Sequence, residues 1–313
     1  MGVLGLVLLI SLQKDNNIRS VWAPQSRGII EWWYESGYLK KNDSLFFFQW
    51  TLFHRRGKPE SYTLHLVLHD FSSDKHYFFY DTKLAGKSEC GEKGDTIFFN
   101  RDNWILFRGE TLTVMAHTGE FSYNIVSVLS KKPVFYGRDG LVSFGNDKEN
   151  GKEFYYLSFT RMRSFGCLLF SNSSDTLFEE GEAWFDRQWG IEKIRPWDWF
   201  SLRLFDNTEI MLYLFRYSED KIACFIDQDG RVSNIDTVTY SVEEYITGCG
   251  NKRFGVKWSI EVMDNQYEIV PLSYYQFNCF SGSSYWEGLC KIIKEGITVG
   301  YAVIETLAEE VEP

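Results

Sequence analysis

The chain lacks most of the motifs that mark common enzyme and nucleic-acid-binding families. Its 313 residues contain no dense run of Lys or Arg, and the formal net charge is −10. Nucleic acids and anionic membrane surfaces are bound through a basic footprint, so neither is expected as a partner. No G-x-S-x-G elbow, Ser/His/Asp triad spacing or glycine-rich phosphate loop is present. The usual hydrolase and nucleotide-binding classes are therefore excluded.

Cysteine is scarce and irregularly spaced. The six cysteines are Cys90, Cys167, Cys224, Cys249, Cys279 and Cys290. No C-x-x-C pair occurs, so neither a structural zinc site nor a thioredoxin-type motif is predicted, and no cofactor is expected. A chain of this size does not need disulfides to fold. We predict mostly buried thiols, with a bridge among Cys249, Cys279 and Cys290 if the protein is exported.

No apolar run is long enough for a membrane-spanning helix. The run Val3–Ile10 is shorter than the roughly 20 residues that such a helix needs. It resembles the apolar part of a signal peptide but lacks a basic start and a small-residue cleavage pattern. Residues 1–16 are predicted to be a leader or an N-terminal extension, and an N-terminal strand is an alternative. The location, cytoplasmic or exported, stays open.

Aromatic residues are abundant, at 18% of the chain, with 11 Trp, 18 Tyr and 26 Phe. Such residues suit pleated β-surfaces and also line apolar ligand cavities. Short apolar runs such as Ser44–Phe53 and Ser61–His69 alternate with turn sequences such as Asp139-Gly140. This spacing predicts an all-β sandwich or barrel. Helical periodicity is nearly absent, and the one candidate helix lies near Ser241–Thr247.

A faint internal repeat suggests that the fold is duplicated. Trp33–Leu39, a polar turn and Leu45–Phe48 are echoed by Trp199–Phe205, a polar turn and Ile210–Tyr213. Two such hairpins, about half a chain apart, predict two barrels of ordinary domain size. Chance similarity between aromatic hairpins is the alternative.

Four segments combine aromatic and acidic residues beyond what core filling requires. They are Glu31–Leu39, Gly181–Gly190, Trp197–Leu204 with Met211–Tyr213, and Tyr285–Gly288 with Gly300–Thr306. In this order they resemble the family of carotenoid 1,2-hydratases (hydroxyneurosporene synthases) and AttH-like proteins. The resemblance covers about residues 28 to 306. It rests mainly on the E-W-W-Y start and the A-W-x-D-x-x-W-G block.

The resemblance implies two tandem lipocalin-like antiparallel β-barrels, with the A-W-x-D-x-x-W-G block at their junction. The expected division is 1–16, 17–190 for the N-terminal domain and 191–313 for the C-terminal domain. Two positions depart from the family pattern: Gln188 stands where many members carry an acid, and Leu307-Ala308 replaces a glycine and tyrosine. The loss of an acid at 188 weakens the hydratase assignment.

The implied hydratase must protonate carbon, shield a carbocation from bulk water and deliver one water molecule. A buried carboxylic acid with a raised pKa suits the first task, and aromatic faces suit the second. On a strand, Trp184 and Asp186 point to the same face. We hypothesise that Asp186 is the general acid, with Trp184 and Trp189 as cation-stabilising walls. Glu31 and Tyr34 would orient the water or a second proton.

The expected partner is a hydrophobic small molecule, isoprenoid or polyketide-like, and the expected reaction is that of a cofactor-independent hydratase, isomerase or cyclase. The candidate ligand-binding residues are Trp33, His65, Trp184, Trp189, Trp199, Tyr285, Trp286 and Glu287. The rival hypothesis is a non-catalytic, possibly exported carrier. A cavity acid without a salt-bridge partner would favour the enzyme. Full neutralisation, for example of Asp186 by Arg187, would favour a structural or carrier role.

Histidine spacing does not predict a metal site. His65 and His69 share one strand face but lie roughly 13 Å apart along an extended strand, too far to bind one ion. His65 is instead expected to lie inside the first barrel and to reach the ligand.

Overall fold

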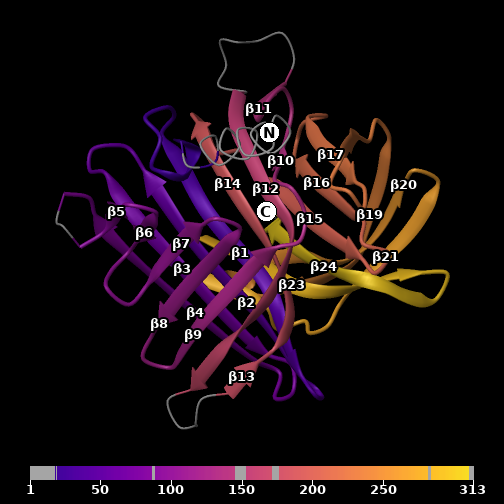
Figure 1. Ribbon diagram of the computed structural model, residues 1–313. Coiled ribbons are helices and arrows are strands. Elements are labelled where there is room, and N and C mark those ends of the chain that lie inside the picture. Colours follow the sequence, from indigo (N-terminus) through magenta and orange to yellow (C-terminus); the bar gives the residue numbers. More distant parts are fainter. Residues whose placement is uncertain are drawn as a thin grey trace, which may run out of the picture.

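Two antiparallel sheets contain most of the described residues of the computed structural model (Figure 1). The structure describes residues 18, 20–86, 89–144, 153–170, 176–280 and 283–309. The predicted leader, residues 1–16, lies outside these ranges. Within them, no helix is both long and apolar enough to cross a membrane. The expected all-β architecture of two tandem lipocalin-like units is confirmed.

The first sheet has 14 strands, with the main order β4-β3-β2-β1-β14-β12-β9-β8-β7-β6-β5. Its strands are β1 (Ile30–Lys41), β2 (Ser44–Arg55), β3 (Ser61–Asp70), β4 (Lys75–Leu84), β5 (Gly91–Lys93), β6 (Thr96–Phe98), β7 (Trp104–Arg108), β8 (Thr111–His117), β9 (Phe121–Leu129), β10 (Val134–Phe135), β11 (Leu141–Ser143), β12 (Glu153–Phe170), β13 (Thr176–Phe178) and β14 (Glu180–Ile191). The first strand therefore pairs with both the second and the last.

The second sheet has 10 strands, with the main order β18-β17-β16-β15-β24-β23-β21-β20-β19. Its strands are β15 (Trp197–Leu204), β16 (Glu209–Phe215), β17 (Lys221–Ile226), β18 (Val232–Asn234), β19 (Val238–Thr247), β20 (Arg253–Val262), β21 (Asn265–Pro271), β22 (Phe277–Phe280), β23 (Ser283–Lys294) and β24 (Ile297–Leu307); the 3-10 helix η1 (Cys249–Asn251) follows β19. The division at 190/191 stays a prediction; the two sheets meet across residues 192–196.

The two sheets repeat one topology around their central strands. β1 pairs with β2 and β14, and β15 pairs with β16 and β24. Tyr34 stands opposite Asp186 in the first sheet, and Trp199 stands opposite Glu305 in the second. The hairpin repeat of the sequence therefore corresponds to a repeat of sheet topology, with Trp199 in the place of Tyr34 rather than Trp33.

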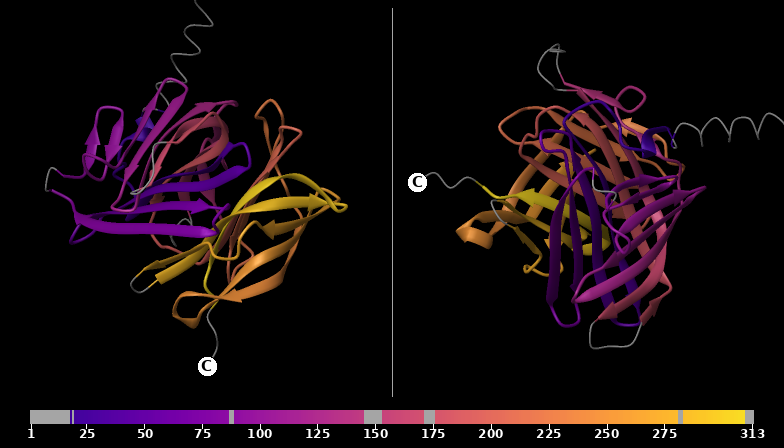
Figure 2. Two further views of the ribbon diagram at one scale, coloured as in Figure 1. Left: turned by 90° about the horizontal axis from the view of Figure 1, so that it is seen from below. Right: turned by 90° about the vertical axis from the view of Figure 1, so that its left-hand side faces the viewer.

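Three apolar clusters form, one inside each curled sheet and one between the sheets. Figure 2 shows the two curled sheets from two further directions. Side chains of β1 alternate between two of them. Trp33 and Leu39 pack inside the first sheet, whereas Trp32 and Tyr34 lie in the inter-sheet layer. Because both faces of β1 are buried, its apolar residues do not alternate regularly with polar ones.

Two expectations about the C-terminal half have different outcomes. The candidate helix at Ser241–Thr247 is wrong, because these residues belong to strand β19. Many side chains of β19 are exposed and it pairs only with β20, so burial alternates with the period of a strand at the edge of a sheet. The predicted bridge among the C-terminal cysteines is present between Cys249 and Cys279, and Cys290 is a buried free thiol.

Candidate functional site

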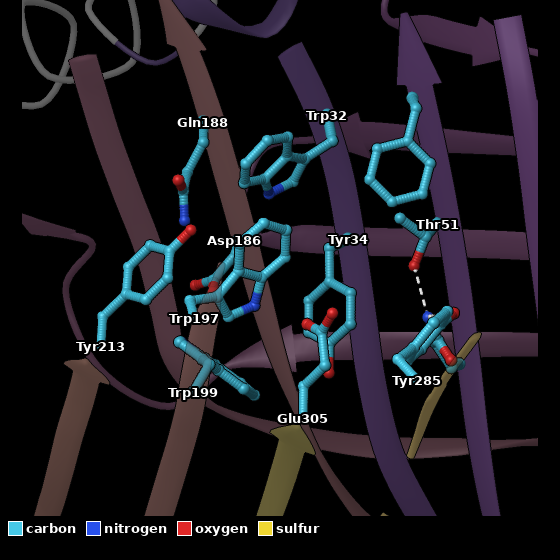
Figure 3. A pocket seen from close by; sticks show the side chains of 12 residues that line it. Trp32, Tyr34, Thr51, Asp186, Gln188, Trp197, Trp199, Tyr213, Tyr285 and Glu305 are labelled. Carbon is cyan, nitrogen blue, oxygen red and sulfur yellow. Dashed lines mark hydrogen bonds between the residues drawn. The ribbon is translucent and has the colours of Figure 1, made fainter. Parts of the chain in front are cut away.

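A small cavity lies in the layer between the two sheets (Figure 3). Its volume is about 30 Å³, close to the volume that one water molecule occupies in the liquid. Its lining is aromatic and polar and comes from both sheets: Trp32, Tyr34, Gln49, Thr51, Phe53, Asp186, Gln188, Trp197, Trp199, Tyr213, Tyr285 and Glu305. One water fits, and a larger ligand must displace side chains.

Asp186 lies on β14 with its carboxylate toward this cavity. It is 3% exposed and accepts three hydrogen bonds, from Tyr156 Oη at 2.6 Å, from Trp184 Nε1 at 2.6 Å and from Ser158 Oγ. Burial raises the pKa of Asp186 to about 7, and the three donors oppose that rise. The carboxyl group therefore titrates near neutral pH, with both oxygens oriented by donors.

Glu305 and Glu287 bring two further acids to the same region. They stand opposite each other on β24 and β23; Glu287 is fully buried and Glu305 is partly buried. Burial raises the pKa of Glu305 to about 8, with a hydrogen bond from Trp197 partly offsetting the rise. Burial and the charge of Glu305 raise the pKa of Glu287 well above its ordinary range. Adjacent carboxyl groups cannot both ionise cheaply, so the pair retains a proton at neutral pH.

Tyr34 connects this acid pair to the cavity. Its hydroxyl lies 2.5 Å from Glu287 Oε1 and 2.7 Å from Ser36 Oγ. Its ring meets Trp199 edge to face, with centroids 5.6 Å apart. In Figure 3 the side chains of Tyr34, Asp186, Trp199 and Glu305 converge on one space. Acidic groups and aromatic faces thus border the same cavity.

None of the three cavity acids has a cationic partner among the described residues. The ion pairs of this part of the chain include no contact of Lys, Arg or His with Asp186, Glu287 or Glu305. The pairing of Asp186 with Arg187, the structural alternative raised from the sequence, does not form. The guanidinium of Arg187 pairs with Glu31 instead.

Six of the predicted site residues lie at or beside the cavity. Tyr34, Asp186, Trp199 and Tyr285 line it. Trp184 lies behind Asp186 and donates to it, as its shared strand face predicts. Glu287 touches the cavity through Tyr34. The roles proposed for these residues stay predictions.

Three predicted tryptophans point away from the cavity. Trp33 and Trp189 pack inside the first sheet, and Trp286 packs inside the second. Each is an odd number of residues from a cavity-lining neighbour, so strand alternation turns it to the opposite face. Trp189 therefore does not stand beside Asp186; it stacks on Tyr155 with centroids 5.0 Å apart.

Glu31 also lies on the far face of β1. It forms ion pairs with Arg187, Arg56 and His54, the last at 2.9 Å. Burial would raise its pKa, but the His54 hydrogen bond and the charge of Arg187 outweigh burial and lower the pKa to about 2. Glu31 is therefore a structural anion that holds the first sheet together, and it does not reach water near Asp186.

His65 lies outside the first barrel, not inside it as expected. Leu64 and Leu66 fill the first core, so the alternating side chain of His65 points into the inter-sheet layer. Its Nδ1 lies 3.0 Å from Tyr285 Oη, and burial lowers the pKa of His65 to about 3. A neutral His65 thus contacts the cavity through Tyr285. Among the described residues no group of three or more potential ligands could hold a metal ion.

Glu305 and Tyr156 were missed from the sequence. A signal for Glu305 existed, because Gly181-Glu182-Ala183-Trp184-Phe185-Asp186 and Gly300-Tyr301-Ala302-Val303-Ile304-Glu305 share the pattern G-x-A-x-x-acid. The pairing registers place the two acids at equivalent positions. Tyr156 carries no comparable signal, because its role depends on the pairing of β12 with β14.

Comparison with known proteins places the chain by family and by fold. The profile of the AttH-like family matches residues 21–305. An AttH candidate from Nitrosomonas europaea superposes with a TM-score of 0.81 at 20% identity, covering 91% of this chain and 94% of its own. No curated protein matches by sequence.

Two further solved structures share the fold. Kievitone hydratase from Nectria haematococca has a TM-score of 0.74 at 14% identity, covering 93% of this chain and 92% of its own. CghA, solved with Sch210972, has a TM-score of 0.59 at 10% identity, covering 89% and 88%. At these identities the likeness establishes the fold and leaves the reaction open.

Proposed function

We propose that this chain, which belongs to the AttH-like family, adds water to or removes water from a carbon–carbon double bond of a hydrophobic small molecule. The reaction takes place in the inter-sheet cavity, where the carboxyl groups of Asp186 and Glu305, with Glu287 behind Tyr34, meet aromatic side chains. An isoprenoid or polyketide-like substrate suits this lining, because its apolar body buries against tryptophan and tyrosine. The hydratase name of one fold neighbour agrees with this reaction class.

In the proposed hydration, Glu305 donates its proton to one alkene carbon. The carbocation that forms lies against the electron-rich faces of Trp197 and Trp199. Water attacks the cation, and the Asp186 carboxylate takes the proton that this water releases. A cavity water then returns the proton from Asp186 to Glu305, so atoms and charge balance. If the cation is captured by the substrate itself, the same first step starts an isomerisation or cyclisation.

This division of roles departs from the sequence hypothesis, in which Asp186 was the acid. Three donors point at the Asp186 carboxylate and favour its ionised form. Glu305 receives a hydrogen bond from Trp197, but burial and the negative charges of Asp186 and Asp198 raise its pKa to about 8, so it retains its proton more readily. Asp186 therefore suits the base, and Glu305 suits the acid.

The position of acids without a cationic partner at a cavity, within the described residues, is the observation that carries the proposal. Glu35 also has no ion pair among the described residues, but it does not line this cavity. Buried carboxylates in purely structural roles are normally paired, as Glu31 is. A carrier would need a largely preformed cavity that matches the size of its ligand. The small cavity, with several acids around it, favours catalysis over storage.

The proposal is tested by mass spectrometry. Ligand that co-purifies from the native host, and a panel of prenylated and polyketide-type alkenes, are incubated with the protein in deuterium oxide. A product that gains or loses the mass of one water, with deuterium on carbon, is expected. Asp186→Asn and Glu305→Gln should each lower turnover by about 10²- to 10⁴-fold, the usual contribution of a general acid or base.

Glu35→Gln is the matched control. Glu35 is also fully buried with a pKa raised by burial to about 8, but it lies on the far face of β1 and accepts a hydrogen bond from Ser127 at 2.6 Å. The Glu35→Gln variant should retain turnover. Folded Asp186→Asn and Glu305→Gln variants with unchanged turnover would exclude this mechanism.

A further inference from the structure

A second buried charged cluster lies at the other end of the inter-sheet layer. We call it the basal cluster; its members are Lys131, Arg161, Glu182, Arg203 and Glu209. Glu209 accepts hydrogen bonds from Lys131 Nζ at 2.8 Å and from Arg161 Nε at 2.6 Å. Arg161 Nη1 donates to Glu182 at 2.9 Å. These contacts use both carboxylates of the basal cluster.

Arg203 is the exception in this cluster. It is 1% exposed, yet none of its three guanidinium nitrogens has a hydrogen-bond partner among the described residues. Glu209 stands directly opposite Arg203 on β16, but its carboxylate oxygens form ion pairs with Lys131 and Arg161. Ser201, two residues earlier on the same strand face, is also fully buried with an unpartnered hydroxyl.

The charges of the basal cluster do not balance. Lys131, Arg161 and Arg203 supply three positive charges, and Glu182 and Glu209 supply two negative ones. A buried charge without a counter-charge is strongly disfavoured, because desolvation is not compensated. The basal cluster therefore lacks one negative charge. Arg203 is the residue whose donors have no hydrogen-bond partner among the described residues.

A surface cavity lies beside this region. It has a volume of about 340 Å³ and is lined by Tyr38, Arg161 and Glu182, among others. The ring of Tyr38 lies 5.7 Å from the Arg203 guanidinium carbon, so Tyr38 separates the cavity from Arg203. The charged residues Arg163, Glu179 and Glu180 at its edge are exposed and screened by solvent.

We propose that Arg203 and Ser201 bind one small monovalent anion, of halide or formate size, between the two sheets. One negative charge restores neutrality, whereas a dianion would overcompensate. The anion accepts from the guanidinium and from the Ser201 hydroxyl, and it stabilises the packing of the sheets. This site is separate from the cavity acids and does not depend on the proposed reaction.

The test compares melting temperatures at constant ionic strength in sodium gluconate, chloride, bromide, formate and sulfate. Gluconate is too large to enter and serves as the reference. We expect chloride, bromide or formate to raise the wild-type melting temperature by about 2–5 °C with saturation. The salt whose effect on the melting temperature saturates at the lower concentration shows whether the site prefers a halide or a small carboxylate. Sulfate stabilises folded proteins generally by exclusion from their surface, so any rise that it gives should grow with concentration without saturation.

Arg203→Met should abolish the anion dependence, and Arg163→Met, on the exposed edge of the same cavity, should retain it. In gluconate, Arg203→Met should melt higher than the wild type, because it removes an uncompensated charge. If Arg203→Met does not fold, the bromide position in wild-type crystals, located by anomalous diffraction, decides the question. Identical melting in all salts, dependence retained in Arg203→Met, or bromide bound elsewhere would each overturn the proposal.

Discussion

Two faces of the same pair of strands hold buried carboxylates with opposite electrostatics. On the face toward the first core, Glu31 lies among Arg187, Arg56 and His54, and its pKa falls to about 2. On the face toward the second sheet, burial raises the pKa of Asp186 to about 7. Both side chains are almost completely buried. The difference therefore comes from partners rather than from depth.

This contrast separates structural from reactive acids. A carboxylate among guanidinium groups stays ionised at any physiological pH and cannot transfer a proton. A carboxylate that receives only neutral donors titrates near pH 7 and can do so. The Asp186 side of β14 is thus suited to chemistry, and the Arg187 side, one residue on, is suited to holding the strand in place.

The largest expected effect is on the structural face. Glu31→Gln leaves the Arg187 guanidinium buried without its counter-charge, and it should lower the free energy of unfolding by about 3–5 kcal/mol. Asp186→Asn removes an unpaired acid and should cost much less. Denaturant titration of the two variants measures the difference. Equal destabilisation would show that the contrast between the faces has no energetic basis.

The pH dependence of stability should have opposite signs for the acids without a cationic partner and for the paired acid Glu31. Glu35 and Glu305 have folded pKa values of about 8, above their unfolded values, so unfolding releases their protons between about pH 4.5 and 8. As the pH rises through that range, each of these two residues should lower the free energy of unfolding by up to about 1.4 kcal/mol per pH unit. Glu31 contributes stability above about pH 4.5 that is lost toward pH 2.

Glu35→Gln isolates one of these contributions. The variant should show a shallower loss of melting temperature from pH 5 to pH 8 than the wild type, and an unchanged loss below pH 4.5. Thermal melts at half-unit pH intervals provide the measurement. A slope identical to that of the wild type would mean that Glu35 ionises freely in the folded protein.

A smaller effect concerns the donors that hold Asp186. Turnover requires Asp186 ionised and Glu305 protonated, so the pH–rate profile should be a bell with limbs near pH 7 and pH 8. Tyr156→Phe removes one donor from the carboxylate and should shift the lower limb upward by up to about one pH unit. A control, Tyr155→Phe, alters the opposite face and should leave both limbs in place.

Strand alternation determined a good part of the candidate site. Trp184 and Asp186 share a face because they are two residues apart, and the same rule, applied to Trp189, would have placed that side chain on the other face. The shared G-x-A-x-x-acid pattern would likewise have pointed to Glu305. These inferences are local, because the period of a strand is a property of its backbone.

The sequence by itself determined the β architecture, its duplication and the segment in which Asp186 lies. Aromatic strands, turn residues and motif order are local features that can be read directly from the sequence. Only the tertiary structure decided which face of β1 meets the second sheet, since both faces carry large buried aromatic side chains. It also decided which acids are paired: Glu31 with Arg187, and Glu287 with Tyr34 across 253 residues. Contacts between distant segments depend on how two sheets pack, and neither periodicity nor composition encodes that choice.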